Sequence, residues 1–237
     1  MPRLEPVESP AADALAHAAF DSLGCEDFGI AIARGASSWG TRETGAIEIP
    51  RADTTLQLGI LHDEREAPYV VGSDGHEAEQ TLVSLTDEGE TLACAWVRTR
   101  PGSPLLGIGI DLASSSDFDD RPFTQRFIEL VFSDAERELV RTTWPDNLTI
   151  GYAAAFGAKE AAFKATAAPL RNWYRSHDEK LSYEVRHFCL VSEHEAKGIM
   201  RNAAAQRAME KIGVRRIVVH YTQMDDLALV VAAALVE

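Results

Sequence analysis

The stretch FGAKEAAFKA, residues 156–165, decides how the rest of the chain is interpreted. Asp146 or Asn147, shortly before it, is a residue type that caps the start of a helix, and Pro169 after it is a residue type that ends one. The sequence therefore predicts one helix that contains the whole stretch and stops at Pro169.

The charged residues of this helix allow two interpretations. Lys164 lies one turn beyond Glu160, so these two residues form either an ordinary surface pair or part of a functional site. At helical spacing, one stripe of the helix holds Phe156, Lys159, Glu160, Phe163 and Ala167.

A second stretch, GIGID at residues 107–111, favours the functional site. It is an apolar, glycine-containing segment with the character of a strand, and it ends on the carboxylate of Asp111. A carboxylate is the kind of oxygen ligand that a hard divalent cation takes.

Together the two stretches resemble the signature motifs of the 4'-phosphopantetheinyl transferases. The family's first motif reads roughly G-I/V-G/D-I-D, and its second reads F/W-x-x-K-E-A/S-x-x-K. Both occur here in the family's order, with an FSxxE segment at residues 132–136 between them, where the family carries one. The resemblance is close over residues 105–165 and loose elsewhere.

The resemblance implies an enzyme that transfers 4'-phosphopantetheine from coenzyme A to a serine of an acyl or peptidyl carrier protein and releases 3',5'-adenosine bisphosphate. Asp111 and Glu160 match the family's ligands for Mg²⁺, whose other positions water and substrate phosphate would fill. Lys159 and Lys164 match the lysines that bind phosphate and stabilise the charge of the leaving group.

Glu136 has a structural and a catalytic interpretation. With Ser133 it matches a capping box at the start of a helix. By resemblance it is the acidic residue of the middle motif, a candidate base for the attacking serine, directly or through water. The sequence alone leaves both open.

The coenzyme A side of the family pattern is only partly kept. The family's hairpin motif Ser-x-Ser-His reads Ser84-Leu85-Thr86-Asp87 here. The resemblance therefore assigns Ser84 and Thr86 to the nucleotide phosphate, while Asp87 would repel it. The second acid of surfactin-type enzymes, two residues after the first aspartate, is replaced by Ala113.

A basic residue is also missing from the family's Gly-Lys-Pro segment, which reads Glu66-Ala67-Pro68 here. We expect an arginine of the first half to compensate for it. We assign Arg51 and Pro68 to coenzyme A as a working prediction. The sequence does not distinguish among the candidates Arg34, Arg42, Arg51 and Arg65.

The predicted fold class is α+β, with two similar halves that form a pseudo-dimer. The segment GIAIA at residues 29–33 matches residues 107–111, which sets Ala33 opposite Asp111, and the strand patterns of residues 83–97 and 219–231 also match. Surfactin-type transferases have this organisation, with the active site in the cleft. We predict a nucleotide-side half at residues 1–103 and a half with the metal and catalytic motifs at residues 104–237.

The local patterns predict further elements, three of which matter below. Asp53 begins a predicted helix through Leu61, and Ser192 with Glu195 forms a second predicted capping box before a long helix to Gly213. Residues 81–86 and 91–97 are predicted to form a hairpin closed near Gly89.

Composition excludes several classes of protein. The net charge of −14 argues against general nucleic-acid binding, and no apolar run is long enough to span a bilayer. Three scattered cysteines form no zinc pattern. The start of the chain lacks a signal pattern, so we expect a cytoplasmic protein, and we expect a monomer.

An acidic protein that binds an acidic carrier protein needs local positive charge. In the family the segment after the metal-binding strand contacts the carrier protein, and here we expect Arg121, Phe123, Arg126 and Phe127 to do so. The alternative is that the phenylalanines are core residues and the arginines pair with nearby acids. Arg137 and Arg141 share a face of the next predicted helix.

A non-enzymatic descendant of the family is the alternative function. The lost nucleotide-side residues favour such a coenzyme A or carrier-protein binding module. The retention of Asp111, Lys159, Glu160 and Lys164 argues against it.

Overall fold

The structure is a computed structural model. It describes residues 6–34, 45–50, 55–62, 68–71, 80–119, 122–178, 181, 183–192, 195–198 and 203–236. Within these ranges the side chains of residues 6–7, 45–50, 55–62, 68–71, 122–123, 195–198 and 203–204 are not described. The predictions for the side chains of Arg51, Pro68, Arg121 and Phe123 therefore lie outside the described residues.

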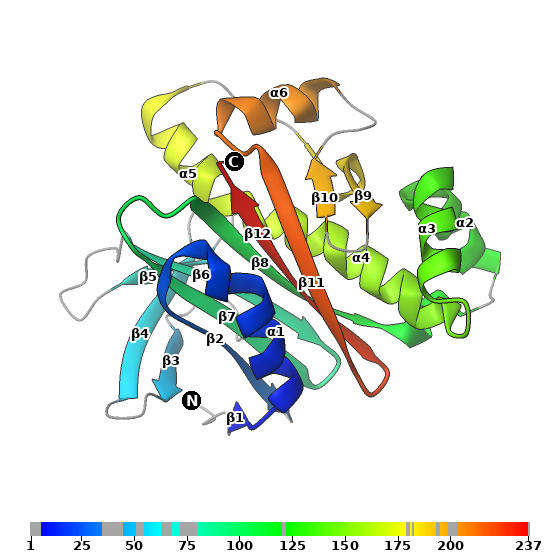
Figure 1. Ribbon diagram of the computed structural model, residues 1–237, viewed down its shortest axis with the longest axis horizontal. Coiled ribbons are helices and arrows are strands. Elements are labelled where there is room, and N and C mark those ends of the chain that lie inside the picture. The colour runs from blue at the N-terminus through cyan, green and yellow to red at the C-terminus, as the bar shows by residue number, and fades with distance from the viewer. Residues whose placement is uncertain are drawn as a thin grey trace.

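The strands within these described ranges form three antiparallel sheets (Figure 1). The first sheet has the order β1-β2-β7-β6, from Pro6–Val7, Cys25–Arg34, Thr91–Thr99 and Thr81–Glu88. The second has the order β8-β12-β11-β10-β9, from Leu105–Ser114, Leu227–Leu235, Arg216–Met224, Glu195–Gly198 and Phe188–Ser192. The third has the order β3-β4-β5, from Gly45–Pro50, Thr55–His62 and Pro68–Val71.

Helices cover both faces of the second sheet. Helix α1 (Pro10–Phe20), capped by Ser9, contacts β2, β11 and β12, and helix α4 (Leu148–Ala165), capped by Asn147, packs on the opposite face. The other helices are α2 (Pro122–Val131), α3 (Asp134–Thr143), α5 (Ala167–Ser176) and α6 (Ala203–Lys211), with short 3₁₀ turns at Asp21–Leu23, Ser115–Phe118 and Val185–His187. The predicted α+β class is confirmed.

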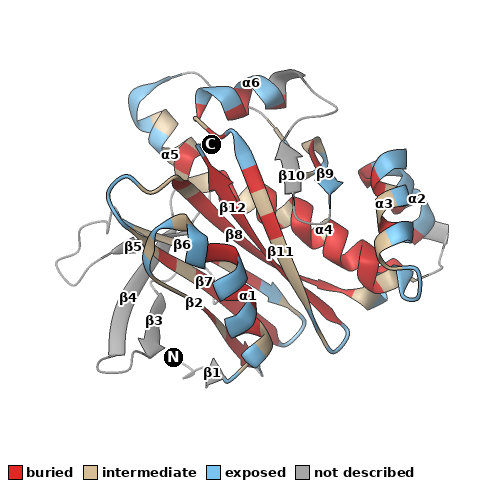
Figure 2. Cartoon of the chain, in the orientation of Figure 1, coloured by how far each residue is buried: buried red, intermediate tan, exposed pale blue. Residues whose placement is uncertain are grey.

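Strand β12 lies at the centre of the protein and is buried on both faces (Figure 2). Leu229 and Val231 face the core shared by α1 and the first sheet, whereas Val230 and Ala232 face the core under α4. Side chains of successive strand residues point to opposite faces, so one apolar strand serves two cores. This explains why Leu227–Leu235 is continuously apolar.

The two halves share one arrangement of strands. The order β2-β7-β6 in the first sheet matches β8-β12-β11 in the second, and two residues close each hairpin. Counted from these hairpins, Asp111 pairs with Val230 and its counterpart Ala31 pairs with Cys94. The predicted alignment of Ala33 with Asp111 is therefore wrong by two residues, because apolar strands of similar composition do not fix their own register.

Helix α4 has no counterpart in the described part of the predicted first half. Between β8 and β11 the chain forms α4, which lies along the second sheet. Between β2 and β6 the described chain forms the third sheet instead. The division of the chain at residue 104 remains a prediction.

Several local predictions are confirmed. The capping box of Ser133 and Glu136 is present, and the hairpin of β6 and β7 closes at Gly89 and Glu90. Asn147 is the residue that caps α4.

Three other local predictions are wrong. Thr55–His62 is a strand because its apolar residues alternate, as half-buried strands require. Ser192 and Glu195 are cross-strand partners, and the helix after them covers only Ala203–Lys211. Helix α4 ends at Ala165, and Pro169 lies in the first turn of α5, where a missing N–H costs nothing.

Candidate active site

Two glycines of β8 let α4 approach the strand closely. A Cβ atom at Gly109 would lie 1.9 Å from the carbonyl oxygen of Ala161, and one at Gly107 would lie 2.1 Å from that of Ala165. Both distances are far below contact distance, so only glycine permits this packing. The glycines of GIGID thus bring the strand that carries Asp111 against the helix that carries Glu160 and Lys164.

Asp111 and Lys164 meet at this junction. The Lys164 ammonium lies 2.6 Å from Oδ1 of Asp111 and donates a second hydrogen bond, 3.1 Å long, to the carbonyl of Ile110. The Thr86 hydroxyl of β6 donates to the same Oδ1 at 3.2 Å. Asp111 is buried, while the Lys164 side chain is 29% exposed.

Glu160 lies close enough for its charge to act on both residues. The pKa of Asp111 is raised from 3.8 to about 6, chiefly by burial; the Glu160 charge also raises it, while Lys164 and the hydrogen bond from Thr86 lower it. Burial also raises the pKa of Glu160, against the opposing effect of Lys164. Lys164 forms its ion pair with Asp111. The alternative interpretation, an ordinary surface pair between Glu160 and Lys164, therefore does not describe α4.

The donor set fits a small divalent cation. Asp111 and Glu160 supply hard carboxylate oxygens, and Oδ2 of Asp111 faces Gly157, where a Cβ atom would come to 3.4 Å from it. Among the residues that the structure describes, no group of three or more His, Cys, Asp or Glu residues is arranged to hold a metal. Two carboxylates, completed by water and phosphate, suit Mg²⁺ better than a closed protein cage would.

The structure places Glu136 and Lys159 in a second, separate pair. Lys159 Nζ lies 2.6 Å from Oε1 of Glu136, with the two side chains 0% and 1% exposed, and it also donates to the carbonyl of Phe188. Oε1 accepts the N–H of Leu190 at 3.1 Å, and Oε2 accepts the N–H and hydroxyl of Ser133 at 2.8 Å each. Lys159 thus extends from α4 toward β9, whereas Lys164 extends toward β8.

Ser84 and Thr86 join β6 of the first sheet to β8 of the second. The Ser84 hydroxyl accepts the N–H of Ile110 at 3.0 Å, and the Thr86 hydroxyl accepts that of Leu112 at 3.3 Å. Both side chains are buried. Their predicted contact with nucleotide phosphate remains a prediction.

Phe127 belongs to the core. It packs against Phe118 and Phe156, with ring centroids 6.2 and 5.4 Å apart, and is partly buried. Arg126 is exposed, whereas Arg137 pairs with Asp134 and Arg141 with Glu138. Two of the expected docking residues, Arg126 and Phe127, have described side chains. Of these two, only Arg126 is exposed to a partner.

The sequence patterns missed two features of the site. Glu88, at the end of β6, lies in the same electrostatic environment as Asp111, whose charge contributes to the raised pKa of Glu88 after burial and Asp117. Thr86 acts as a hydrogen-bond donor to Asp111. The pairing of the half-repeats was the available signal for both, because it brings the β6–β7 hairpin beside β8.

The family comparison is consistent with this geometry. Residues 107–207 match the family model of the 4'-phosphopantetheinyl transferase superfamily. The resemblance inferred from the sequence is confirmed for this segment, which contains Asp111, Glu136, Lys159, Glu160 and Lys164. The surfactin-type, two-half organisation remains a prediction, since the match lies in the second half alone.

Solved structures of carrier-protein synthases are also similar. Holo-acyl-carrier-protein synthase from Neisseria meningitidis is 20% identical with a TM-score of 0.40 and covers 55% of this chain and 98% of its own. The acyl carrier protein synthase of Mycobacterium tuberculosis is 24% identical, with a TM-score of 0.35 and coverages of 55% and 96%. Holo-ACP-synthase from Plasmodium yoelii is 16% identical, with a TM-score of 0.38 and coverages of 56% and 96%. No curated protein matches the chain.

None of the helices in the described ranges combines the length and apolar character needed to cross a membrane.

Proposed function

We propose that this protein transfers 4'-phosphopantetheine from coenzyme A to a serine of an acyl or peptidyl carrier protein, as a holo-acyl-carrier-protein synthase. The observation that supports this most is the convergence of Asp111, Glu160 and Lys164, from two distant motifs, at the junction of β8 and α4. The superfamily match over residues 107–207 contains both motifs.

Asp111 and Glu160 are the proposed ligands of Mg²⁺. A bound ion would neutralise the pyrophosphate of coenzyme A and polarise its phosphoryl oxygens. Burial keeps this pair of carboxylates in a poorly hydrated environment, where the attraction for a cation is stronger than in water.

Lys164 is the proposed phosphate-binding residue. Its partly exposed ammonium is held beside Asp111, on the same side of α4 as Glu160. When the serine oxygen bonds to phosphorus, the bond to 3',5'-adenosine bisphosphate breaks and negative charge collects on the departing phosphate. An ammonium at that position stabilises the transition state more than the ground state.

The serine proton must pass to a base as the phosphate ester forms. The resemblance assigns this role to Glu136 and phosphate binding to Lys159, and both assignments remain predictions. In the structure the two residues saturate each other in a buried pair. These roles would require the pair to separate before the reaction, so the function proposed here does not depend on them.

Further residues are proposed to contact the two substrates, coenzyme A and the carrier protein. Thr86 is the best supported of the proposed coenzyme A residues because it touches Asp111. Ser84 lies beside it on β6, and Arg51 and Pro68 complete the proposed set. For the acidic carrier protein we propose contacts with Arg121, Phe123 and Arg126, and we no longer include Phe127 because it packs in the core.

A catalytically impaired binding module is the second candidate. Lys164 occupies Oδ1 of Asp111, and Asp87 follows Thr86 where the family carries a histidine that touches phosphate. Such a protein would bind coenzyme A or the carrier protein without transferring the group.

Intact-mass measurement of a carrier protein separates the two candidates. We expect the purified protein to add phosphopantetheine to apo-carrier protein with coenzyme A and Mg²⁺, and to stop when a chelator is added. Glu160→Gln should abolish transfer and leave the melting temperature unchanged, while Glu138→Gln on exposed α3 should retain full activity. Binding of coenzyme A without any transfer, across acyl and peptidyl carrier proteins, would contradict the proposed activity and support the binding module.

A further inference from the structure

The far edge of the second sheet ends on an ion pair instead of another strand. Among the residues that the structure describes, strand β9 pairs with β10 and with no other strand. On its other side, the carbonyl of Phe188 accepts a hydrogen bond from Lys159, and the N–H of Leu190 donates one to Glu136. These are the two kinds of bond that a neighbouring strand would have made. The pair thus occupies the place of a missing strand.

Every polar group of the pair has a role in this arrangement. Glu136 accepts four hydrogen bonds, from Lys159, Leu190 and two groups of Ser133, which also fixes the start of α3. Lys159 adds a contact over the Phe132 ring, 5.5 Å from its centroid. A buried pair repays its desolvation only when its remaining polar atoms are satisfied in this way.

The pair also fixes the rotation of α4 about its axis. Lys159 ties the helix to β9, and Lys164, five residues later, ties it to β8 at the opposite edge of the same sheet. Glu160 lies between these two anchors and directly follows Lys159 in the chain. A helix held at two sheet edges cannot turn without breaking one of the anchors.

We propose that Glu136 and Lys159 are positioning residues: their buried pair closes the β9 edge and holds α4 in the rotation that presents Glu160 to Asp111. The orientation of Glu160 toward a cation rests on the proposed function, whereas the closure of the sheet edge does not. In this role neither residue touches substrate.

A cycle of variants tests this proposal. Glu136→Gln or Lys159→Met leaves a lone buried charge, which must reach water by displacing α3, β9 or α4. We expect each to lower the melting temperature by roughly 10 °C or more. The double variant Glu136→Gln with Lys159→Met removes both charges and keeps one carbonyl oxygen, which can accept from either Ser133 or Leu190. It should recover part of the lost stability, because no lone charge is left buried. Glu138→Gln with Arg141→Met, a surface pair on α3, is the matched control and should show no such coupling.

Affinity for Mn²⁺ alone, measured by calorimetry, distinguishes positioning from simple stabilisation. In the folded single variants we expect it to fall about tenfold, because Glu160 is displaced, and in the double variant to return to within about threefold of the original. If the single variants do not fold, the double variant carries the test, and it must fold and bind Mn²⁺ normally.

Two results would overturn the proposal. One is single variants with unchanged stability and unchanged Mn²⁺ affinity, which would show that the pair fixes nothing. The other is a double variant that folds and binds Mn²⁺ normally but transfers phosphopantetheine at least a hundredfold more slowly, which would make the pair catalytic. The first result depends on no activity measurement, so failure of the proposed function cannot be mistaken for it.

Discussion

Helix α4 carries two lysine–carboxylate pairs that differ in almost every physical respect. Lys159 and Glu136 are fully buried at the β9 edge of the second sheet, and their polar atoms are saturated by backbone and capping groups. Lys164 and Asp111 lie at the β8 edge, where the lysine is partly exposed and a further carboxylate, Glu160, lies nearby. Figure 2 shows that α4 is largely buried where it lies along the second sheet.

The two pairs differ in what they can offer a ligand. A saturated buried pair has nothing left to offer a ligand, and its separation is costly. A partly exposed pair with an excess carboxylate attracts a cation. Two lysine–carboxylate pairs on one helix therefore need not have the same role, because their neighbours differ.

The largest loss of stability is expected from a substitution where α4 packs against β8. Gly109→Ala places a Cβ atom 1.9 Å from a backbone oxygen, so helix and strand must move apart. We expect a loss of about 3 kcal/mol or more in unfolding free energy, measured by urea denaturation, together with loss of transfer. Gly157→Ala, whose Cβ atom would lie 3.0 Å from a movable Val230 methyl group, is the control and should cost much less. Equal costs for the two would show that the close approach at β8 is not required.

The next effect sharpens the contrast between the lysines. Lys164→Met should slow transfer by about a hundredfold, because its loss removes charge stabilisation at a partly exposed position. It should lower the melting temperature less than Lys159→Met does, because Asp111, with its raised pKa, can take up a proton when it loses its partner. Lys159→Met should lower the melting temperature by roughly 10 °C or more, because it leaves Glu136 as a lone buried charge. Steady-state kinetics and thermal melts on both variants measure this, and a Lys164→Met enzyme with normal turnover would refute the role given to Lys164.

A smaller effect concerns pH. The folded-state pKa of Asp111, about 6, lies above the ordinary 3.8, so the folded protein binds more protons than the unfolded chain between these values. Stability from this group is therefore present at low pH and lost as pH rises from about 4 to about 6, by about 1–3 kcal/mol. Denaturation in chelator should show this loss for the unmodified protein relative to Asp111→Asn. A constant difference between the two proteins from pH 4 to pH 7 would contradict it.

The smallest effect is expected on the surface. Arg126→Glu should raise KM for an acidic carrier protein by a few fold, more at low salt, and leave the affinity for coenzyme A unchanged. Arg141→Glu is the control because its partner Glu138 already neutralises that arginine. A change in coenzyme A affinity instead would assign Arg126 to the nucleotide.

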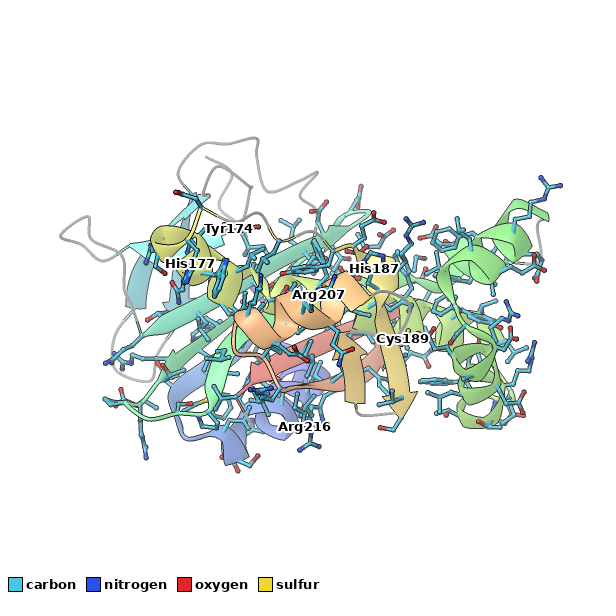
Figure 3. The ribbon with its side chains drawn as sticks, turned by 90° about the horizontal axis from the view of Figure 1, so that it is seen from above. Tyr174, His177, His187, Cys189, Arg207 and Arg216 are labelled. Carbon is cyan, nitrogen blue, oxygen red and sulfur yellow. The ribbon has the colours of Figure 1, made fainter. Side chains whose placement is uncertain are left out.

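Figure 3, seen from above, shows the side chains of Tyr174 on α5, of His177 directly after it and of Arg207 on α6. Tyr174 uses its hydroxyl to hold the backbone of Leu181, and His177 stacks on Trp173 with ring centroids 3.6 Å apart. These contacts are local to α5 and give no reason to move the proposed docking surface there.

The sequence predicted the parts of the site that depend on local patterns. The cap at Asn147, the capping box at Ser133 and the GIGID strand are each encoded within a few residues, and Asp111, Glu160 and Lys164 converge as the motifs suggested. The helical spacing of residues in α4, in contrast, did not predict that Lys159 reaches β9 and Lys164 reaches β8. Lys159 meets the backbone of Phe188, a partner almost thirty residues away, and no periodicity records such a contact.

The wrong predictions have the same origin. The apolar spacing in Thr55–His62 fits both a helix and a strand, and pairing with β3 and β5 decides between them. Ser192 and Glu195 fit a capping box and a cross-strand pair equally well, and the presence of β11 beside β10 selects the strand. Where two local structures suit one pattern, a distant neighbour makes the choice.

The most direct test of the account is a time course of carrier-protein modification by intact mass, run at equal concentration with three proteins in Mg²⁺. The account predicts that the unmodified protein and the double variant Glu136→Gln with Lys159→Met both complete the transfer, while Glu160→Gln shows none. Transfer by Glu160→Gln, with none by a correctly folded double variant, would contradict it and would place the chemistry at the buried pair.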